Sequence, residues 1–431
     1  MKNIKPKSVL RVKIMMLVLL IFASFSISYS QNETITLEEC QQWAQDNYPL
    51  VKQLALIEQS TDFTLENINK AKLPQISLNG QFTYQSEVTS IPINIPNIEI
   101  PTINKQQYKL YIDAYKSLTN YNEISTQKEL VSANAAIEQQ QIEVELRQLK
   151  ERINQLYFGV LLIDETKQQL LIYKENLQST HLKIKAAVQN GIAIEANAQQ
   201  VEAEIINIDQ KLNENALQKQ TYLNMLAALT QQTFSENISL ALPLQIPFAE
   251  DLNRKELQLF ALQTNAVALQ EQRINNRKIP AVGLFLQAGF GNPALNMFQT
   301  EISPYYIGGL RLNWNLSSLY TNKNDRQIIG INQQKINHQQ QLFILNAKLQ
   351  LQQQATELEK YETLIQNDEK LLALRQDIKK TAAIQLENGI ITTTDFLQFS
   401  NDENTARLNL ALHKMQLLMQ QYLYATTSGN Y

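Results

Sequence analysis

Apolar residues recur at every seventh position over a long stretch in the first half of the chain. The repeat consists of Ile142, Leu149, Leu156, Ile163, Leu170, Leu177 and Ile184, with Leu146, Ile153 and Val160 in the intervening positions. This spacing is typical of a coiled-coil seam. It predicts a helix from about Tyr121 to Asn190, roughly 105 Å long at the helical rise of about 1.5 Å per residue.

The predicted rod ends at an Asn-Gly pair, Asn190-Gly191. Glycine just after the last helical turn readily takes the left-handed conformation that terminates a helix. A helical pattern resumes near Ala196 and continues to about Gln232, so we expect a second helix that returns antiparallel to the first.

The second half of the chain repeats this pattern. We expect a long helix from about Asn322 to Glu387, the pair Asn388-Gly389, and a returning helix to about Thr426. The seven-residue spacing is carried here by Leu351, Leu358, Ile365 and Leu372.

Four short segments between the helices alternate apolar and polar residues, which predicts strands with one apolar face. They are 75–84, 108–115, 282–290 and 310–316. A length of about ten residues suits a tilted membrane strand. Four strands cannot close a barrel, and open edges in lipid cost several kcal/mol per unpaired group. Either other copies of the chain complete the sheet, or it is a soluble sheet whose apolar face packs on a helix.

The two halves look like an internal duplication. The segment 69–84 aligns with 275–290, which places Pro74 opposite Pro280. We therefore expect a first repeat over 31–232, a linker over 233–252 and a second repeat over 253–431. Each repeat contains a helix, a strand pair and a long helical hairpin.

Composition supports a chain of few, long elements. Glycine and proline number only 11 each, where average usage would give about 30 and 20. No proline lies between Pro101 and Pro243 or after Pro304. The chain holds 52 Gln and 40 Asn but only 18% charged residues, against about 25% in an average protein. A compact enzyme needs more turns, and this surface is polar without being strongly charged.

The candidate chemistry is sparse. The net charge is -3 and no basic patch points to nucleic acid. Cys40 is the single cysteine, and no Cys/His cluster or phosphate-binding loop occurs. The three histidines, His181, His338 and His413, lie in helical stretches and are expected to be solvated or interhelical. We expect no catalytic residue, no cofactor and no metal.

The N-terminus has the features of an export signal. Five basic residues precede an apolar run from Ile14 to Phe25, which ends before Ser28-Tyr29-Ser30. Cleavage after Ser30 would remove residues 1–30 and leave a mature charge of -8. An uncleaved signal anchor is the alternative.

Five sequence motifs carry a resemblance to a known family. Four of them are 36–49, which contains Thr-Leu-Glu-Glu and Asn-Tyr-Pro, and 72–74, 310–316 and 387–397. The fifth, 190–200, repeats the pattern of 387–397 in the first half of the chain. In this order the chain resembles the TolC-like outer-membrane efflux proteins over essentially its whole mature length. The resemblance implies that the protein is not an enzyme.

The resemblance implies a mainly α protein with membrane β-structure. Each chain of a homotrimer would give four strands to a 12-stranded barrel and four helical rods to a 12-helix periplasmic tunnel. The partners would be outer-membrane lipid, a periplasmic adaptor and an inner-membrane transporter. The protein would be a passive exit duct in the outer membrane for a tripartite efflux or type I secretion system. A periplasmic coiled-coil adaptor or scaffold is the alternative.

The same resemblance places a pore constriction at the periplasmic tip. Its expected residues are Asp395, Gln398, Asn197, Leu386 and Ile391, and the expected adaptor contacts are the turns at Asn190, Gly191, Asn388 and Gly389. Leu386 and Ile391 occupy positions where tight family members have Tyr and Arg, so we expect apolar closure and one ring of Asp395 carboxylates.

Two further interpretations stay open. Asp395 could instead complete a capping box with Thr392 at the start of its helix, and both roles can hold at once. The Ile- and Pro-rich loop 87–106 could form a lid over the barrel mouth or a rigid loop packed on its neighbour.

Overall fold

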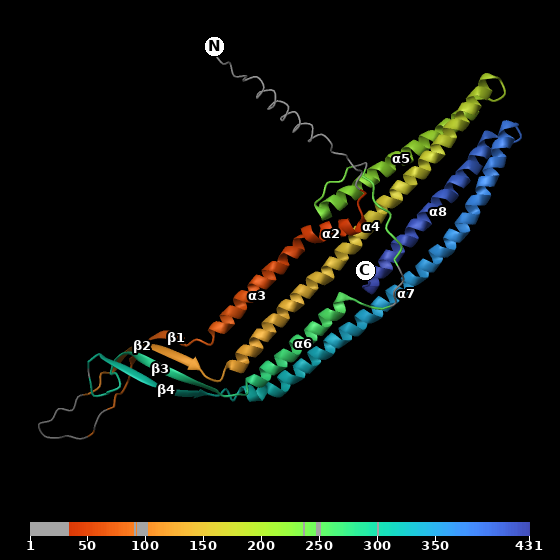
Figure 1. Ribbon diagram of the computed structural model, residues 1–431. Coiled ribbons are helices and arrows are strands. Elements are labelled where there is room, and N and C mark those ends of the chain that lie inside the picture. Colours follow the sequence, from red (N-terminus) through yellow and green to blue (C-terminus); the bar gives the residue numbers. More distant parts are fainter. Residues whose placement is uncertain (1–33, 90–91, 93–101, 236–237, 247–250, 300) are drawn as a thin grey trace, which may run out of the picture. The chain divides into compact units, whose positions relative to one another are not determined.

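The computed structural model describes residues 34–89, 92, 102–235, 238–246, 251–299 and 301–431. The predicted signal peptide and most of the 87–106 loop lie outside the described residues. The elements in chain order are α2 (Leu37–Asn47), η1 (Pro49–Val51), α3 (Lys52–Lys70), β1 (Gln75–Tyr84), β2 (Gln106–Ser117), α4 (Tyr121–Gln189), α5 (Glu195–Thr230), α6 (Lys255–Asn276), β3 (Ala281–Asn292), β4 (Ser303–Asn313), α7 (Ser318–Glu387) and α8 (Thr393–Ser428) (Figure 1).

The predicted rods are confirmed. Helices α4 and α7 contain 69 and 70 residues, and α5 and α8 contain 36 each. The equal lengths, and the proline immediately before or at the start of each repeat's first strand, support an internal duplication. The absence of helix breakers in these stretches is the local reason for their length.

The four strands form one antiparallel sheet in the order β1-β2-β3-β4. Register pairs Leu78 with Ile112, Leu110 with Phe290, and Leu284 with Leu310. Because side chains alternate across a strand, these pairs put most of the large apolar side chains of the four strands on one face, the apolar face. Among the described residues, β1 pairs only with β2 and β4 pairs only with β3, so each leaves one edge unpaired.

The fourth strand differs from its prediction. It runs from Ser303 to Asn313 rather than over 310–316. Trp314 leaves the ladder, and its indole Nε1 donates to the carbonyl oxygen of Lys278 at 3.1 Å. The chain then turns at once into α7, where the Ser318 hydroxyl donates to the Asn315 carbonyl at 2.7 Å. This turn also explains why α7 begins four residues earlier than expected.

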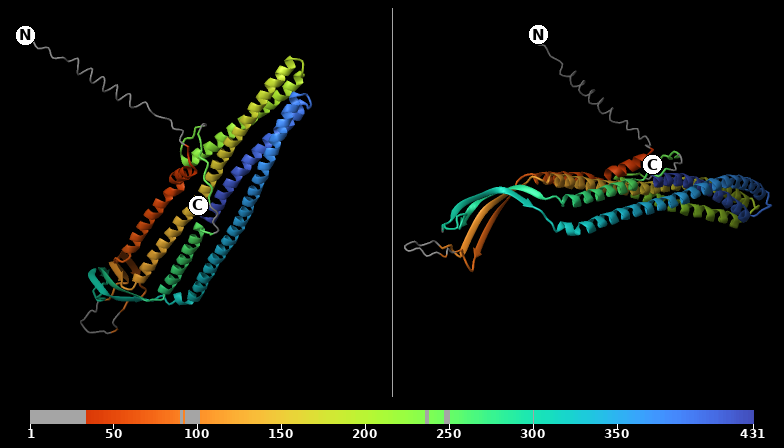
Figure 2. Two further views of the ribbon diagram at one scale, coloured as in Figure 1. Left: turned by 45° about the vertical axis from the view of Figure 1, so that its right-hand side comes forward. Right: turned by 90° about the horizontal axis from the view of Figure 1, so that it is seen from below.

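The chain divides into two compact units that cut across the repeats. Of the described residues, the sheet unit comprises those within 48–151, 251–359 and 420–431, and the tip unit comprises those within 34–47, 152–246 and 360–419. In the sheet unit, helices lead away from the strands and lie alongside one another (Figure 2). Helix α4 contacts α6 where Arg273 and Glu123 form a 3.3 Å ion pair, and α6 contacts α7 through Phe260 and Phe343.

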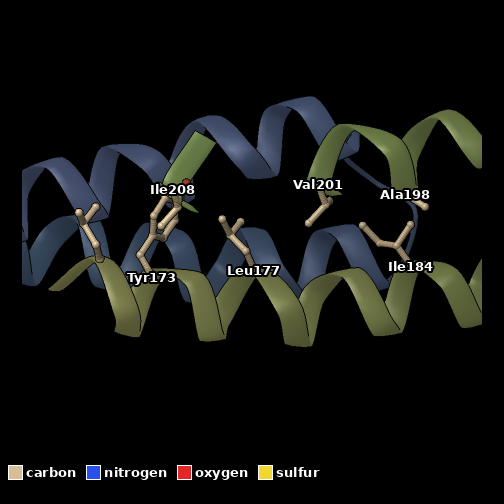
Figure 3. Packing of buried hydrophobic residues seen from close by; sticks show 7 residues of the cluster. Tyr173, Leu177, Ile184, Ala198, Val201 and Ile208 are labelled. Carbon is tan, nitrogen blue, oxygen red and sulfur yellow. The ribbon is translucent and has the colours of Figure 1, made fainter. Parts of the chain in front are cut away.

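The core of the tip unit confirms the predicted seam. The seam residues Leu170, Leu177 and Ile184 of α4 are buried and pack with Ala198, Val201 and Ile208 of α5. In Figure 3, Leu177 and Ile184 of α4 and Val201 of α5 point into the space between the two helices. Leu386, Leu397 and Leu408 of the α7–α8 hairpin pack against the same cluster, so one core joins both hairpins.

Candidate functional site

The two hairpin turns share one backbone geometry. Gly191 and Gly389 have φ angles of 72° and 69°, in the left-handed region. Each glycine N–H donates to the carbonyl three residues earlier at 3.0 Å, and the following isoleucine donates five residues back at 2.8 Å. This is the Schellman motif, which explains why the sequence places glycine here. The predicted turns at Asn190-Gly191 and Asn388-Gly389 are therefore confirmed as helix ends.

Apolar side chains are exposed at both turns. Ile192 is 81% exposed and Ile390 is 69% exposed, directly after the two glycines. The neighbouring amides are engaged locally, since Asn190 and Asn388 donate to the carbonyls of Ala186 and Ile384 at 2.9 and 2.8 Å. Each turn thus presents an isoleucine, with the asparagine turned back onto its own helix.

Asp395 completes the predicted capping box. Its backbone N–H donates to the Thr392 hydroxyl at 3.2 Å, while the Thr392 N–H and hydroxyl donate to its carboxylate at 3.0 and 2.6 Å. These hydrogen bonds hold the pKa of Asp395 below its usual 3.8, and the one from the Thr392 hydroxyl has the largest effect. The carboxylate stays exposed and ionised at neutral pH. A second role in a ring stays a prediction.

The other predicted constriction residues have separate surroundings. Gln398 is exposed and donates to Asp402 at 2.9 Å, while Asn197 is half-buried in the first turn of α5. Leu386 is half-buried against the hairpin core, and Ile391 is half-buried in the turn. Leu386 is therefore brought together with the first hairpin, while its part in closing a pore stays a prediction.

Two polar contacts join the hairpins near the turns. Lys183 of α4 and Glu387 of α7 form an exposed ion pair at 2.6 Å. The Thr394 hydroxyl of α8 donates to Gln200 of α5 at 3.2 Å. The two predicted tip segments therefore lie side by side within the chain.

Sequence reasoning missed a buried charge between α7 and α8. The Glu403 side chain is 5% exposed and contacts Lys379 at 3.1 Å as well as Arg407. Burial raises the pKa of Glu403, but the hydrogen bonds and charges of Arg407 and Lys379 outweigh it, so the pKa lies below its usual 4.5. The i,i+4 spacing of Glu403 and Arg407 was the available signal.

The histidine prediction holds for His413, which pairs with Asp368 of α7 across the same hairpin. The single thiol lies in the core: Cys40 is buried, and burial together with Glu39 and Glu38 raises its pKa to about 12. Among the described residues, no group of three or more His, Cys, Asp or Glu could hold a metal ion.

The apolar face of the sheet lies open to its surroundings. Ile76 and Leu78 of β1 and Leu310 of β4 are 70–72% exposed, and central residues such as Ile112 and Leu286 are about half exposed. Burying such a face would yield roughly 25 cal/mol per Å². Exposed apolar patches of this kind mark interaction sites. No helix of the described residues is long and apolar enough to cross a membrane.

Helix α7 carries a second exposed apolar surface. Its stripe consists of two groups, each at three- and four-residue spacing: Leu342, Leu345 and Leu349, and, 22 residues further on, Leu371, Leu374 and Ile378. Each of these side chains is between 41% and 62% exposed. The stripe lies on one helical face. The described parts of this chain leave it largely uncovered.

The fold is similar to that of solved outer-membrane channels. The Campylobacter jejuni CmeC outer membrane channel matches with a TM-score of 0.66 and 13% identity over 93% of this chain and 86% of that one. The outer-membrane channel OprN matches with a TM-score of 0.68 and 14% identity over 92% and 90%. The open state of the Neisseria gonorrhoeae MtrE outer membrane channel matches with a TM-score of 0.62 and 14% identity over 91% and 89%.

No protein-family model and no curated protein matches the chain in sequence. At these identities the likeness extends to the fold. The chain has the TolC-like fold of outer-membrane factor channels, with four strands and four long helical rods.

Proposed function

We propose that this protein is an outer-membrane channel that serves as the passive exit duct of a tripartite efflux or type I secretion system. The observation that carries the proposal is the sheet, because most of its apolar face is exposed and its two outer edges are unpaired among the described residues. Lipid would cover the face, and neighbouring copies would pair with the edges, since open edges are not tolerated in hydrocarbon. The shared fold with outer-membrane channels supports this role.

A homotrimer is the assembly that the proposal requires. Three sheets would give 12 strands in one barrel, and the exposed stripe on α7 would pack against a second copy. The proposed location is the outer membrane, with the helical rods forming a tunnel in the periplasm. No nucleic acid, cofactor or catalytic residue has a place in this proposal.

The hairpin turns are the proposed contact with a periplasmic adaptor, which would connect the channel to an inner-membrane transporter. Exposed Ile192 and Ile390 support this part of the proposal, since a solvent-exposed apolar pair beside a rigid turn is suited to docking. The competing scaffold function would leave the apolar face of the sheet without a partner.

The first experiment tests the channel. Protein purified from the membrane fraction should migrate in detergent as a heat-modifiable trimer with a β signal, and should conduct ions in planar bilayers. A soluble monomer would contradict the channel and favour the scaffold.

A second experiment tests the adaptor contact. A photo-crosslinking residue at Ile192 or Ile390 should capture the adaptor, whereas the same residue at Leu217 should not. Leu217 is a matched control because it is 72% exposed but lies 22 residues from the end of α5 nearest the turn. Equal capture at all three positions would count against docking at the turns.

The constriction is tested by separating the two roles of Asp395. Asp395→Asn removes the charge and keeps a side chain of the same size, whereas Thr392→Ala removes the cap and keeps the charge. A carboxylate ring predicts that only Asp395→Asn changes the conductance and its block by cations. An unchanged block in Asp395→Asn would rule the ring out and leave Asp395 as a cap.

A further inference from the structure

The face of the sheet opposite the apolar face carries a cluster of aromatic rings around one arginine. We define the arginine–aromatic cluster as Asp113 and Tyr115 of β2, Phe285 of β3 and Arg311 of β4. The guanidinium carbon of Arg311 lies 4.5 Å from the centroid of the Phe285 ring and 5.8 Å from that of Tyr115. Three neighbouring strands thus meet at one side chain.

Two glycines make this meeting possible. Register places Gly283 opposite Arg311 and Gly309 opposite Phe285. A Cβ on Gly283 would lie 2.6 Å from the Tyr115 ring, and one on Gly309 would lie 3.2 Å from the Phe285 ring. The rings therefore lie across positions that only glycine leaves free. Stacking on these rings fixes the guanidinium against the wall of the sheet.

The cluster holds one cation and one anion, and the cation is the more exposed of the two. Arg311 and Asp113 form a loose ion pair at 3.6 Å, with side-chain exposures of 41% and 18%. The remaining charged side chain on this face of the strands is the exposed Lys109, so the face has an excess of one cation per chain. The apolar face carries Lys116 at the helical end of β2.

Apart from the loose ion pair with Asp113, the N–H donors of Arg311 have no acceptor among the described residues. No hydrogen bond joins Arg311 to a described residue, although a guanidinium has five N–H donors in a planar fork. Such a fork can donate two parallel hydrogen bonds to two oxygens of one acidic group, as it does with carboxylates and phosphates. The cluster therefore combines a half-exposed cation, which is only loosely paired with Asp113, with two half-buried aromatic rings beside it.

We propose that the arginine–aromatic cluster is a binding site for aromatic anions, such as sulfonates and carboxylates, in which Arg311 contacts the acidic group. The solute's ring would pack against Phe285 and Tyr115. The site lies within one chain. A role for this site in contacting exported solutes rests on the proposed channel function, in which this face of the sheet lines the lumen of the barrel.

The probe is 2-naphthalenesulfonate, whose fluorescence reports binding to the full-length protein held in amphipol. The wild-type protein should bind it saturably, and Arg311→Gln should weaken binding about tenfold or more, because a charge-assisted hydrogen bond is lost. Arg311→Lys should lie between the two, since it keeps the charge but loses the planar fork. Methanesulfonate, which has no ring, should compete poorly.

Lys116→Gln is the matched control, because it removes a cation from the same end of the sheet on the opposite face. It should leave binding unchanged. Equal binding by the wild-type protein and Arg311→Gln, or an equal loss in Lys116→Gln, would overturn the site. If Arg311→Gln fails to assemble, the Arg311→Lys comparison and the loss of ring packing in Phe285→Leu test the same site.

Failure of the site differs from failure of the channel. Wild-type protein that binds the probe but forms no conducting pore would contradict the proposed channel function and leave the binding site standing. Protein that conducts ions but binds the probe no better than Arg311→Gln would contradict the site alone.

Discussion

At the scale of single residues, the two hairpin turns differ at the position that starts the returning helix. Thr392 holds Asp395 in a capping box at the second turn. Ile194 occupies the equivalent position at the first turn and makes no side-chain cap. The first turn of α5 thus leaves backbone N–H groups without the side-chain partner that α8 has.

Thr392→Ala should therefore loosen the start of α8. Loss of an N-cap costs about 1 kcal/mol, and native-state hydrogen exchange of the first turn of α8 should report it. Ile194→Thr is the reverse experiment: Ile194 is 67% exposed, so the change removes little packing and adds a cap. Protection in α5 should rise. If both variants exchange like the wild type, the cap contributes nothing to either turn.

The buried Glu403 predicts a pH dependence. Its folded pKa lies below 4.5, so its contribution to stability is present above that pH and is lost as the pH falls through the folded pKa. Glu403→Gln should destabilise the α7–α8 hairpin by about 1–3 kcal/mol near pH 7, because Lys379 and Arg407 lose their counterion. The difference from wild type should shrink below pH 4.5, as measured by thermal unfolding across a pH series.

Glu369→Gln provides the control for this prediction. Glu369 pairs with Lys414 on the same two helices, but both side chains are more than half exposed. The same substitution there should change stability by less than about 0.5 kcal/mol at any pH. Equal effects of the two substitutions would contradict a special role for the buried carboxylate.

At the scale of elements, glycine has opposite effects in a turn and in a helix. Gly191 and Gly389 have positive φ angles and nothing within 4 Å of an added Cβ, so any penalty of alanine there comes from the backbone alone. Gly191→Ala and Gly389→Ala should each cost about 1 kcal/mol. Hydrogen exchange at the hairpin ends would measure the change.

Gly330 gives the matched control within α7. It too has nothing within 4 Å of an added Cβ, but its φ angle is not positive. Gly330→Ala should stabilise α7 by about 0.5–1 kcal/mol, because alanine loses less entropy in a helix. A loss of stability at Gly330 similar to that at the turns would contradict the conformational explanation.

Local patterns predicted the elements well where residue spacing or a single glycine determines the local structure. The seam from Ile142 to Ile184 is buried because seven-residue spacing forces one face together, and the turns follow from glycine's access to positive φ. The start of β4 was missed because Ser303–Gly309 contains no regular alternation. The chain there becomes a strand through pairing with β3.

Contacts between distant elements could not be predicted from the same patterns. Lys379 meets Glu403 only when α7 and α8 pair in one register, and neither helix specifies that register locally. The arginine–aromatic cluster likewise requires the strand order β2-β3-β4 before Tyr115 can reach Arg311. The residue types were visible in the sequence, but their partners were set by tertiary packing.

At the scale of the whole molecule, the open surfaces of one chain call for assembly. The two unpaired sheet edges, the apolar sheet face and the stripe on α7 are all exposed in the described chain. Lipid could cover the sheet face, but it offers no hydrogen bonds to the edges. The proposed trimer satisfies both requirements, since neighbouring copies pair with the edges and cover the stripe.

Adjacent residues on the central strand β3 test which face meets lipid. Leu286 lies on the apolar face and is about half exposed, whereas Gln287 points to the opposite face. Leu286→Arg should lower the yield of folded trimer in the outer membrane, because a lipid-facing arginine costs about 2–4 kcal/mol at mid-bilayer. Gln287→Arg adds the same charge one residue away and should assemble normally, since water would solvate it in the lumen.

Heat-modifiable migration of protein from the membrane fraction measures how much trimer each variant forms. Normal assembly of Leu286→Arg, or equal loss in the two variants, would mean that this face does not lie in lipid and would remove the main support for the channel.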